Sequence, residues 1–414
     1  MDLDWKNFNF VLFKAKDTSN LRDLICSVSD YSWGPRDTCS ISMNPVEDNY
    51  KFSHHTTHSW NCDGKVLRLE DPLEPGNLEL FKFSWKHSQP VIVEGIGDTL
   101  DSSLWSPSNF LDLPDHGFDP ANPESSAVSN GQTLKKFFDG LDNTSRRPVG
   151  DNGEPMCLKL RDGWPLQEDQ FQELLPVQCK DILRNLPLKQ YMDRSGILNL
   201  ASMLPECFVR LDLGPRLRGG YGKSVYAMKY NTSDTFSVCV YTGKDGKEDI
   251  RETLRNLKCD KSCLEKAGLN PSKLAALWTV FHPSEADKVK SFILRNLKSE
   301  GKVKPKDPLY DQTMYLKDRH LDKLLEEENI KPMVFTQLQG EGISIPAGAP
   351  FQVKFLQASL LIQIDSISPE HMDQAMQIRP SDMHRFDDRF QVKNLVFHSC
   401  KDALSVLFNQ DKKK

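Results

Sequence analysis

The chain has 414 residues, with 58 acidic against 53 basic side chains, a net charge of -5 and 38% hydrophobic residues. This composition is typical of a folded globular protein, and at about 150 residues per domain it allows two to three domains or one large decorated domain. The slight acidity argues against direct nucleic-acid binding, which relies on basic patches. No apolar run reaches the ~18 residues of a membrane span, and the acidic start is no secretory signal, so no membrane partner is expected.

Two groups of potential metal ligands are present, but neither has the spacing of a known site. The ten cysteines are scattered, and only Cys259 and Cys263 lie close together. A structural zinc site needs four ligands, usually from two such pairs. His54, His55 and His58 have no cysteines or acids at matching spacing. The sequence therefore predicts reduced thiols of a nuclear or cytosolic protein and a solvated histidine-containing loop.

The first half of the chain divides into an irregular part and a part with regular periodicity. Residues 1–63 are polar and show no clear period. Residues 64–204 are expected to form the N-terminal helical and strand part of a larger module. Within it, apolar runs and helical spacing predict a strand at 90–93 and helices at 133–141, 167–175 and 177–186.

Residues 205–365 are rich in predicted strands, which fall into two blocks. The first block has strands at 207–211, 224–230 and 236–241, and the second at 334–338, 342–345, 352–356 and 360–365. A helical insertion at about 244–332 separates them, and residues 366–414 supply C-terminal helices and a tail, with a long amphipathic helix at 392–408. Two strand blocks that fold against each other predict a mixed α/β chain with an all-β core, a jelly-roll or double-stranded β-helix.

A series of short segments, in a fixed order from about residue 58 to 408, resembles one family. They include Leu-Trp-Ser-Pro at 104–107, Leu-Asn-Leu-Ala at 198–201, Asp-Leu-Gly-Pro at 212–215, Ile-Pro-Ala-Gly at 345–348 and Ser-Pro-Glu-His at 368–371. The chain is similar to the Jumonji-C (JmjC) histone lysine demethylases that act on the heterochromatic methyl mark of histone H3. The resemblance implies a cupin-like double-stranded β-helix with helical decoration.

The same resemblance implies a cofactor chemistry and the positions that would support it. Enzymes of the family use Fe(II), held by two histidines and one carboxylate, together with 2-oxoglutarate. The first histidine and the carboxylate precede a Ser-Asp pair, here at 233–234, and the second histidine follows the Ile-Pro-Ala-Gly turn. Those three positions hold Lys229, Asn231 and Phe351 in this chain.

All three residues are poor ligands for iron. A protonated ammonium and a phenyl ring offer no lone pair, so Lys229 and Phe351 cannot replace histidine. The positions that help to hold 2-oxoglutarate fall on Tyr226 and Ser237. From these substitutions we expect no catalytic residue, no metal site, and the loss of both Fe(II) and 2-oxoglutarate.

The resulting hypothesis is a pseudoenzyme: a nuclear chromatin and heterochromatin regulator that acts through protein–protein contact. Its expected partners are silencing proteins, the histone H3 tail, a second copy of itself or a related JmjC protein. One alternative is an active Fe(II)- and 2-oxoglutarate-dependent demethylase with an unrecognised ligand set. Another is an enzyme of altered chemistry, in which burial lowers the pKa of Lys229 and makes it a base or nucleophile. A structural interpretation instead pairs Lys229 with Asp234 or Asp212.

Overall fold

A computed structural model gives the fold of most of the chain. It describes residues 56–113, 120–121, 133–150, 153, 155–160, 164–165, 168–243, 247–301, 305–378 and 391–411. Most of the segment 1–63, including His54 and His55, lies outside the described residues. His58 begins β1, and its Nδ1 lies 2.8 Å from the carbonyl oxygen of Thr56.

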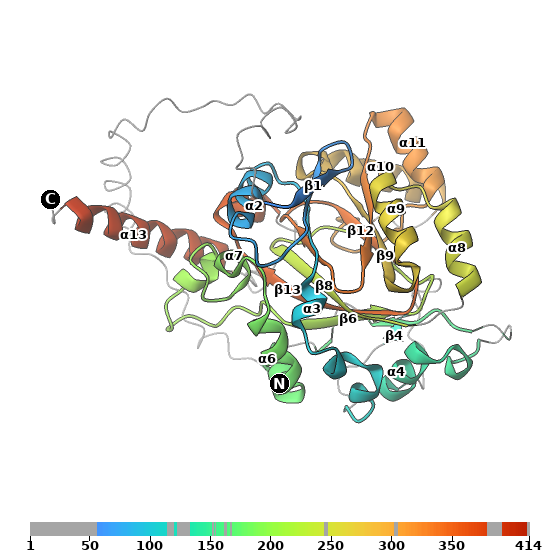
Figure 1. Cartoon of the computed structure of the whole chain (residues 1–414). Helices are drawn as coiled ribbons and strands as arrows, with labels where there is room; N and C mark the ends of the chain where they lie inside the picture. Colours follow the sequence, from blue (N-terminus) through green and yellow to red (C-terminus); the bar gives the residue numbers. More distant parts are fainter. Residues whose placement is uncertain are drawn as a thin grey trace, which may run out of the picture.

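The described strands form two sheets that face each other (Figure 1). In the nine-stranded sheet the order is β1 (His58–Asn61), β2 (Val66–Leu69), β3 (Val91–Val93), β11 (Gly342–Ile345), β8 (Asp234–Thr242), β13 (Ser359–Ser366), β6 (Arg216–Gly220), β5 (Lys159–Leu160) and β4 (Pro120–Ala121). The four-stranded sheet has the order β10 (Met333–Leu338), β9 (Leu274–Val280), β12 (Phe351–Phe355) and β7 (Val225–Lys229). β2 and β3 are parallel, and the other described pairs of strands are antiparallel.

Alternation along β13 shows how one strand serves two cores. Leu360, Ile362 and Ile364 pack with the helices on the outer face of the nine-stranded sheet. Leu361 belongs to the cluster between the sheets, together with Trp278 and the other inward-facing side chains of the barrel. Successive side chains of a strand point to opposite faces, and because β13 is covered on both sides, its side chains are buried in both registers.

The helices cover the outside of this barrel. They are α2 (Asn77–Lys86), α3 (Ile96–Thr99), α4 (Leu134–Asp142), α5 (Glu168–Leu174), α6 (Pro176–Arg184), α7 (Lys189–Met192), α8 (Lys247–Asn256), α9 (Lys261–Leu269), α10 (Ala286–Ser299), α11 (Asp318–Glu328), α12 (Met372–Gln377) and α13 (Val392–Asp411). In Figure 1, α8 to α11 stand together on one side of the sheets, and α13 extends from the opposite side. Among the described residues, none of the helices combines the length and the apolarity of a membrane span.

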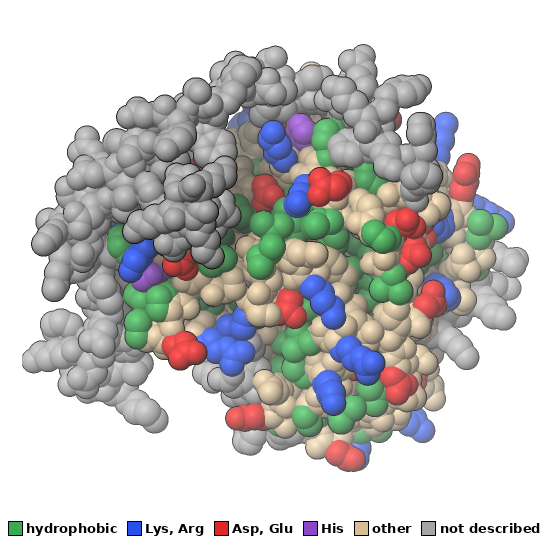
Figure 2. Space-filling view, turned by 60° about the vertical axis from the view of Figure 1, so that its left-hand side comes forward, with side chains coloured by type: hydrophobic (Ala, Val, Ile, Leu, Met, Phe, Trp, Pro, Cys, Tyr) green, Lys and Arg blue, Asp and Glu red, His purple; other side chains and the backbone are tan. Residues whose placement is uncertain are grey.

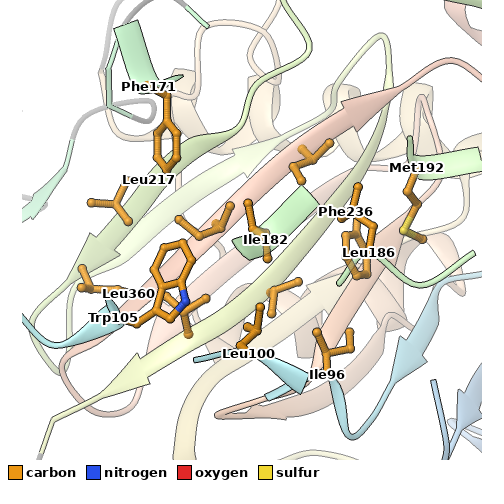
Figure 3. Packing of buried hydrophobic residues seen from close by; sticks show 14 of the residues in the cluster. Ile96, Leu100, Trp105, Phe171, Ile182, Leu186, Met192, Leu217, Phe236 and Leu360 are labelled. Carbon is orange, nitrogen blue, oxygen red and sulfur yellow. The ribbon is translucent and has the colours of Figure 1, made fainter. Parts of the chain in front are cut away.

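Helix α4 illustrates why the helices form where they do. Thr133 caps it, since the side-chain oxygen accepts a hydrogen bond from the backbone N–H of Lys136. Leu134, Phe137, Phe138 and Leu141 are buried on one face, at the spacing that the sequence shows. The face packs into the outer core, where Trp105, Leu217 and Leu360 also lie (Figure 3).

The architecture is therefore a mixed α/β fold around a double-stranded β-helix, as expected from the sequence. Three details differ from the expectation. The predicted strand at 207–211 is absent, and the neighbouring strand is β6 (Arg216–Gly220). The stretch 244–332 contains not only helices but also β9, an inner strand of the four-stranded sheet. The strands β1 and β2 join the large sheet and were not predicted.

Candidate functional site at the barrel mouth

Two turns frame one end of the barrel. The first, residues 230–233, joins β7 to β8, and the second, residues 346–350, joins β11 to β12. Lys229 ends β7 and Phe351 begins β12, and the two are register partners in the four-stranded sheet. The structure thus brings together Lys229, Asn231 and Phe351, the three positions that the resemblance assigns to iron ligands.

The side chains at these positions do not fit Fe(II). Phe351 is 2% exposed, and its ring stacks on Trp278 at a centroid distance of 5.8 Å. The ammonium nitrogen of Lys229, itself 5% exposed, lies 5.5 Å from the centroid of the Phe351 ring. Elsewhere in the described part of the chain, no group of three His, Cys, Asp or Glu side chains is placed to hold a metal ion. We therefore assign no iron-binding role to these three residues.

Asn231 braces the two turns against each other. Its carbonyl oxygen accepts a hydrogen bond of 2.9 Å from the backbone N–H of Gly348. Its side-chain amide donates to the Thr235 hydroxyl at 2.6 Å. Gly348 has a φ of +78°, a conformation that glycine adopts without strain. Where the resemblance places a carboxylate ligand, this chain therefore has an asparagine that joins the two turns.

A buried ion pair lies directly behind the mouth. Asp234, 2% exposed, accepts hydrogen bonds of 2.9 Å from the backbone N–H groups of Ala347 and Ser368. Its Oδ1 also lies 2.6 Å from His371 Nδ1, and the other ring nitrogen of His371 lies 2.9 Å from the carbonyl oxygen of Trp85. Both ring nitrogens thus face acceptors, an arrangement that fits the doubly protonated imidazolium.

The pKa directions of this pair agree with the geometry. Burial by itself raises the pKa of Asp234, but the charge of His371 and the hydrogen bonds from His371, Ser368 and Ala347 outweigh it and hold the pKa below its usual value. Burial by itself lowers the pKa of His371, but Asp234 and the Trp85 carbonyl raise it above its usual value. The pair ties β8, the second turn and α2 together.

The two carboxylates considered as partners of Lys229 each pair with another cation. The carboxylate of Asp234 pairs with His371, and that of Asp212 pairs with Arg216 at 2.6 Å, while the interpretation that pairs either one with Lys229 stays a prediction. No role of His371 was expected from the sequence. The available signal was the Ser-Pro-Glu-His segment, whose histidine is buried at 2% exposure.

The two positions assigned to 2-oxoglutarate lie on the barrel wall. Tyr226 is 2% exposed, and its hydroxyl donates to the carbonyl oxygen of Leu160 at 2.7 Å. Ser237 lies in β8 between Ile343 of β11 and Gln363 of β13. A role for either side chain toward 2-oxoglutarate stays a prediction.

A separate hollow of about 2070 Å³ lies over the outer face of the four-stranded sheet. Leu277, Thr279, Gln352 and Lys354 form part of its lining, and Lys and Arg outnumber Asp and Glu around it. Lys229, Asn231 and Phe351 do not line it. On the face shown in Figure 2, acidic and basic side chains of the described residues are interspersed, with no large patch of one sign.

The barrel, its two turns and its helical covering define a JmjC-type double-stranded β-helix. No model of a known protein family matches the chain. The chain is 35% identical over 375 residues to chicken lysine-specific demethylase 3A and 34% identical over 375 residues to the human protein of that name. It is 32% identical over 433 residues to human probable JmjC domain-containing histone demethylation protein 2C.

The chain belongs to the JmjC histone lysine demethylase family. The matches cover 85% of the chain for the two 3A proteins and 94% for the 2C protein. In the other direction, the chain spans 28% of the length of the 3A proteins and 16% of the 2C protein.

These relatives overturn two predictions. The expectation that the chain is not an enzyme is wrong, because its relatives over 375 residues are lysine-specific demethylases by name. The expectation that Fe(II) and 2-oxoglutarate are lost is wrong for the same reason, since the family is one of Fe(II)- and 2-oxoglutarate-dependent enzymes. The substitutions at Lys229, Asn231 and Phe351 concern these three positions alone. They do not exclude metal ligands elsewhere in the chain.

Proposed function

We propose that the chain acts in the nucleus as a chromatin protein that binds the amino-terminal tail of histone H3. The observation that carries this proposal is the match over 375 residues to lysine-specific demethylases, joined by a relative named for histone demethylation. The net charge of -5 is opposite in sign to that of a lysine- and arginine-rich tail. Opposite charge favours encounter and correct orientation.

The barrel mouth is the surface that we assign to the tail. Asp234 and Asn231 hold both of its turns by hydrogen bonds, so the rim has one shape before a peptide arrives. A preorganised rim loses less conformational entropy on binding. The hollow over the four-stranded sheet is less suited, because its surplus of Lys and Arg would repel a basic peptide.

The test is a titration of the chain with an amino-terminal histone H3 peptide, monitored by calorimetry, at low and at physiological salt. The peptide is used unmethylated, dimethylated at the heterochromatic lysine, and scrambled. Thr232 is partly exposed in the first turn, so Thr232→Arg places a positive charge at the mouth. We expect it to weaken binding at least about fivefold, roughly 1 kcal/mol.

The matched control is Leu269→Arg, which adds the same charge at an exposed position of α9, outside the two turns. It should leave the affinity unchanged. Equal loss in both variants, or equal binding of the scrambled peptide, would show that the tail does not dock at the mouth.

The same mixtures show what the chain does with a bound tail. The dimethylated peptide is incubated with Fe(II), 2-oxoglutarate and oxygen, and its mass is measured. Loss of methyl groups would support demethylation with ligands other than Lys229, Asn231 and Phe351. Binding without loss of mass would support a contribution to heterochromatin through contact, for instance by pairing with a related JmjC protein.

A further inference from the structure

The hollow over the outer face of the four-stranded sheet has a floor that combines apolar and basic side chains. On β9 and β12, the paired residues Trp278 and Val353 belong to the core between the sheets. Successive strand residues point to opposite faces, so the next pair, Leu277 and Lys354, faces outward into the hollow. Val225 of β7 lies beside Lys354 and also lines the hollow. The three outward side chains are partly exposed, so a partner can reach this floor.

Three lysines of the hollow have no carboxylate partner among the residues that the structure describes. Lys354 lies on the floor, Lys223 lies shortly before β7, and Lys261 begins α9. Lys223 and Lys261 are exposed. Each ammonium group is a compact positive charge with several donors, so each can pair with a carboxylate of another molecule.

The acidic side chains of the hollow do not cancel this charge. Asp63 pairs with Lys331 at 2.9 Å, Asp322 pairs with Lys258 at 3.2 Å, and all four residues line the hollow. Each of these pairs is neutral as a unit, and Lys and Arg outnumber Asp and Glu in the lining as a whole. A cleft with a surplus of one sign concentrates its electric field, so this hollow attracts a negatively charged partner.

The size and the apolar surface of the hollow favour a peptide over a small anion or a nucleic acid. Its volume of about 2070 Å³ exceeds the roughly 300–1,000 Å³ of pockets for small molecules. Besides the floor, Leu321 and Leu325 of α11 line it, about one helical turn apart, and Leu325 is 44% exposed. Interfaces with DNA are polar, whereas apolar side chains of a peptide gain free energy by covering such leucines.

We propose that this hollow binds a short acidic segment of a partner protein. Carboxylates of the segment pair with Lys223, Lys261 and Lys354, and its apolar side chains cover Leu277 and Leu325. The proposal does not rest on histone binding, because the three predicted ligand positions at the barrel mouth do not line the hollow. A basic tail at the mouth and an acidic segment here occupy different surfaces, so either proposal can fail while the other holds.

The experiment measures binding of short fluorescent peptides to the full chain by fluorescence anisotropy, at low and at physiological salt. The probe has a leucine after every two glutamates. One matched peptide replaces glutamate by lysine, and another replaces leucine by serine. We expect the glutamate–leucine probe to bind most tightly of the three, and more weakly at physiological salt, because ions screen exposed charges. The double variant Lys223→Glu, Lys261→Glu should weaken its binding at least about fivefold, since attraction becomes repulsion.

The matched control is the double variant Lys180→Glu, Lys393→Glu, at exposed positions of α6 and α13 that do not line the hollow. It changes the net charge equally and should bind the probe as the unchanged chain does. Leu325→Ala tests the apolar contact. It should weaken the glutamate–leucine probe and leave the glutamate–serine peptide unchanged, because only the former covers this side chain.

Four results would overturn the proposal. Equal loss in the two double variants, both folded by circular dichroism, would show that only the net charge of the chain matters. Equal binding of the glutamate–serine peptide would show that the floor takes no apolar side chain. Release of the probe by duplex DNA at lower concentration than by unlabelled probe would assign the hollow to nucleic acid. No binding of the probe at low salt would show that the hollow has no affinity for an acidic segment.

Discussion

At the barrel mouth Asp234 and His371 compensate each other, whereas on the wall of the same barrel Arg218 is buried against a tyrosine ring. Both regions hide charge at similar exposure, 2% for the pair and 7% for the arginine. The mouth satisfies its charges with side chains of the chain itself. On the wall, the guanidinium of Arg218 lies near the Tyr226 ring, and its Nε has no hydrogen-bond partner among the described residues.

The comparison separates compensated from uncompensated burial of charge. A complete pair with additional hydrogen bonds holds neighbouring elements in place, and removing one member exposes the cost of burying the other. A lone buried charge gives the fold no such benefit. The predictions below test this distinction, beginning with the largest expected change in stability.

Asp234→Ala should destabilise the barrel mouth. It leaves the His371 imidazolium uncompensated and two backbone N–H groups without an acceptor, so we expect a loss of about 4 kcal/mol in the free energy of unfolding. Urea denaturation measures it. Asp322→Ala, which removes an exposed partner of Lys258, should change little. A loss no larger than that of this control would mean that the pair contributes nothing.

Substitution of the two arginines of β6 should have unequal effects on stability. Arg216→Met leaves the buried Asp365 carboxylate without its cation and should cost about 3 kcal/mol of stability. Arg218→Met should cost nothing. Both variants remove one charge from the same face, so urea midpoints compare them directly. Equal losses would show that the two buried arginines contribute equally to stability.

The assignment of the three mouth positions can be tested by restoring ligands. The combined variant Lys229→His, Asn231→Asp and Phe351→His should bind Mn(II) at least tenfold more tightly than the unchanged chain, about 1.4 kcal/mol. Calorimetry gives both affinities, and circular dichroism shows whether the variant is folded. An unchanged affinity in a folded variant would mean that these positions are not where a metal would sit.

The smallest expected effect is the pH dependence of the stability that Asp234 and His371 contribute. The pKa of Asp234 is lowered on folding, so its contribution is present above the unfolded value of about 3.9 and is lost as the pH falls through the folded value. The pKa of His371 is raised, so its contribution is complete below about 6.5 and is lost as the pH rises through the folded value.

The stabilising effect of the pair should therefore be complete between about pH 4 and pH 6.5 and should decline on either side. Urea denaturation of the unchanged chain and of the double variant Asp234→Ala, His371→Ala, at pH 5 and pH 9, measures the difference. A difference that does not shrink from pH 5 to pH 9 would contradict the charged pair.

Much of the fold was accessible from the sequence. The predicted strands at 334–338, 342–345 and 360–365 agree closely with β10, β11 and β13, since these short segments are rich in apolar residues and are bounded by turn residues. The helix predicted at 133–141 is α4, whose cap and apolar face are local features. β9 was missed, because its run of small and apolar residues carries no alternation and its partners lie far away in the chain.

The amino-acid sequence by itself determined the family, the β-helix core, and the residues that occupy the three mouth positions. Those features depend on local periodicity and on short segments in a fixed order. Only the tertiary structure decided that Asp234 pairs with His371, 137 residues away, and that Arg218 has a tyrosine ring where Arg216 has two carboxylates. Pairing of buried charges depends on which strands and turns meet, and neither spacing nor composition along a chain records that.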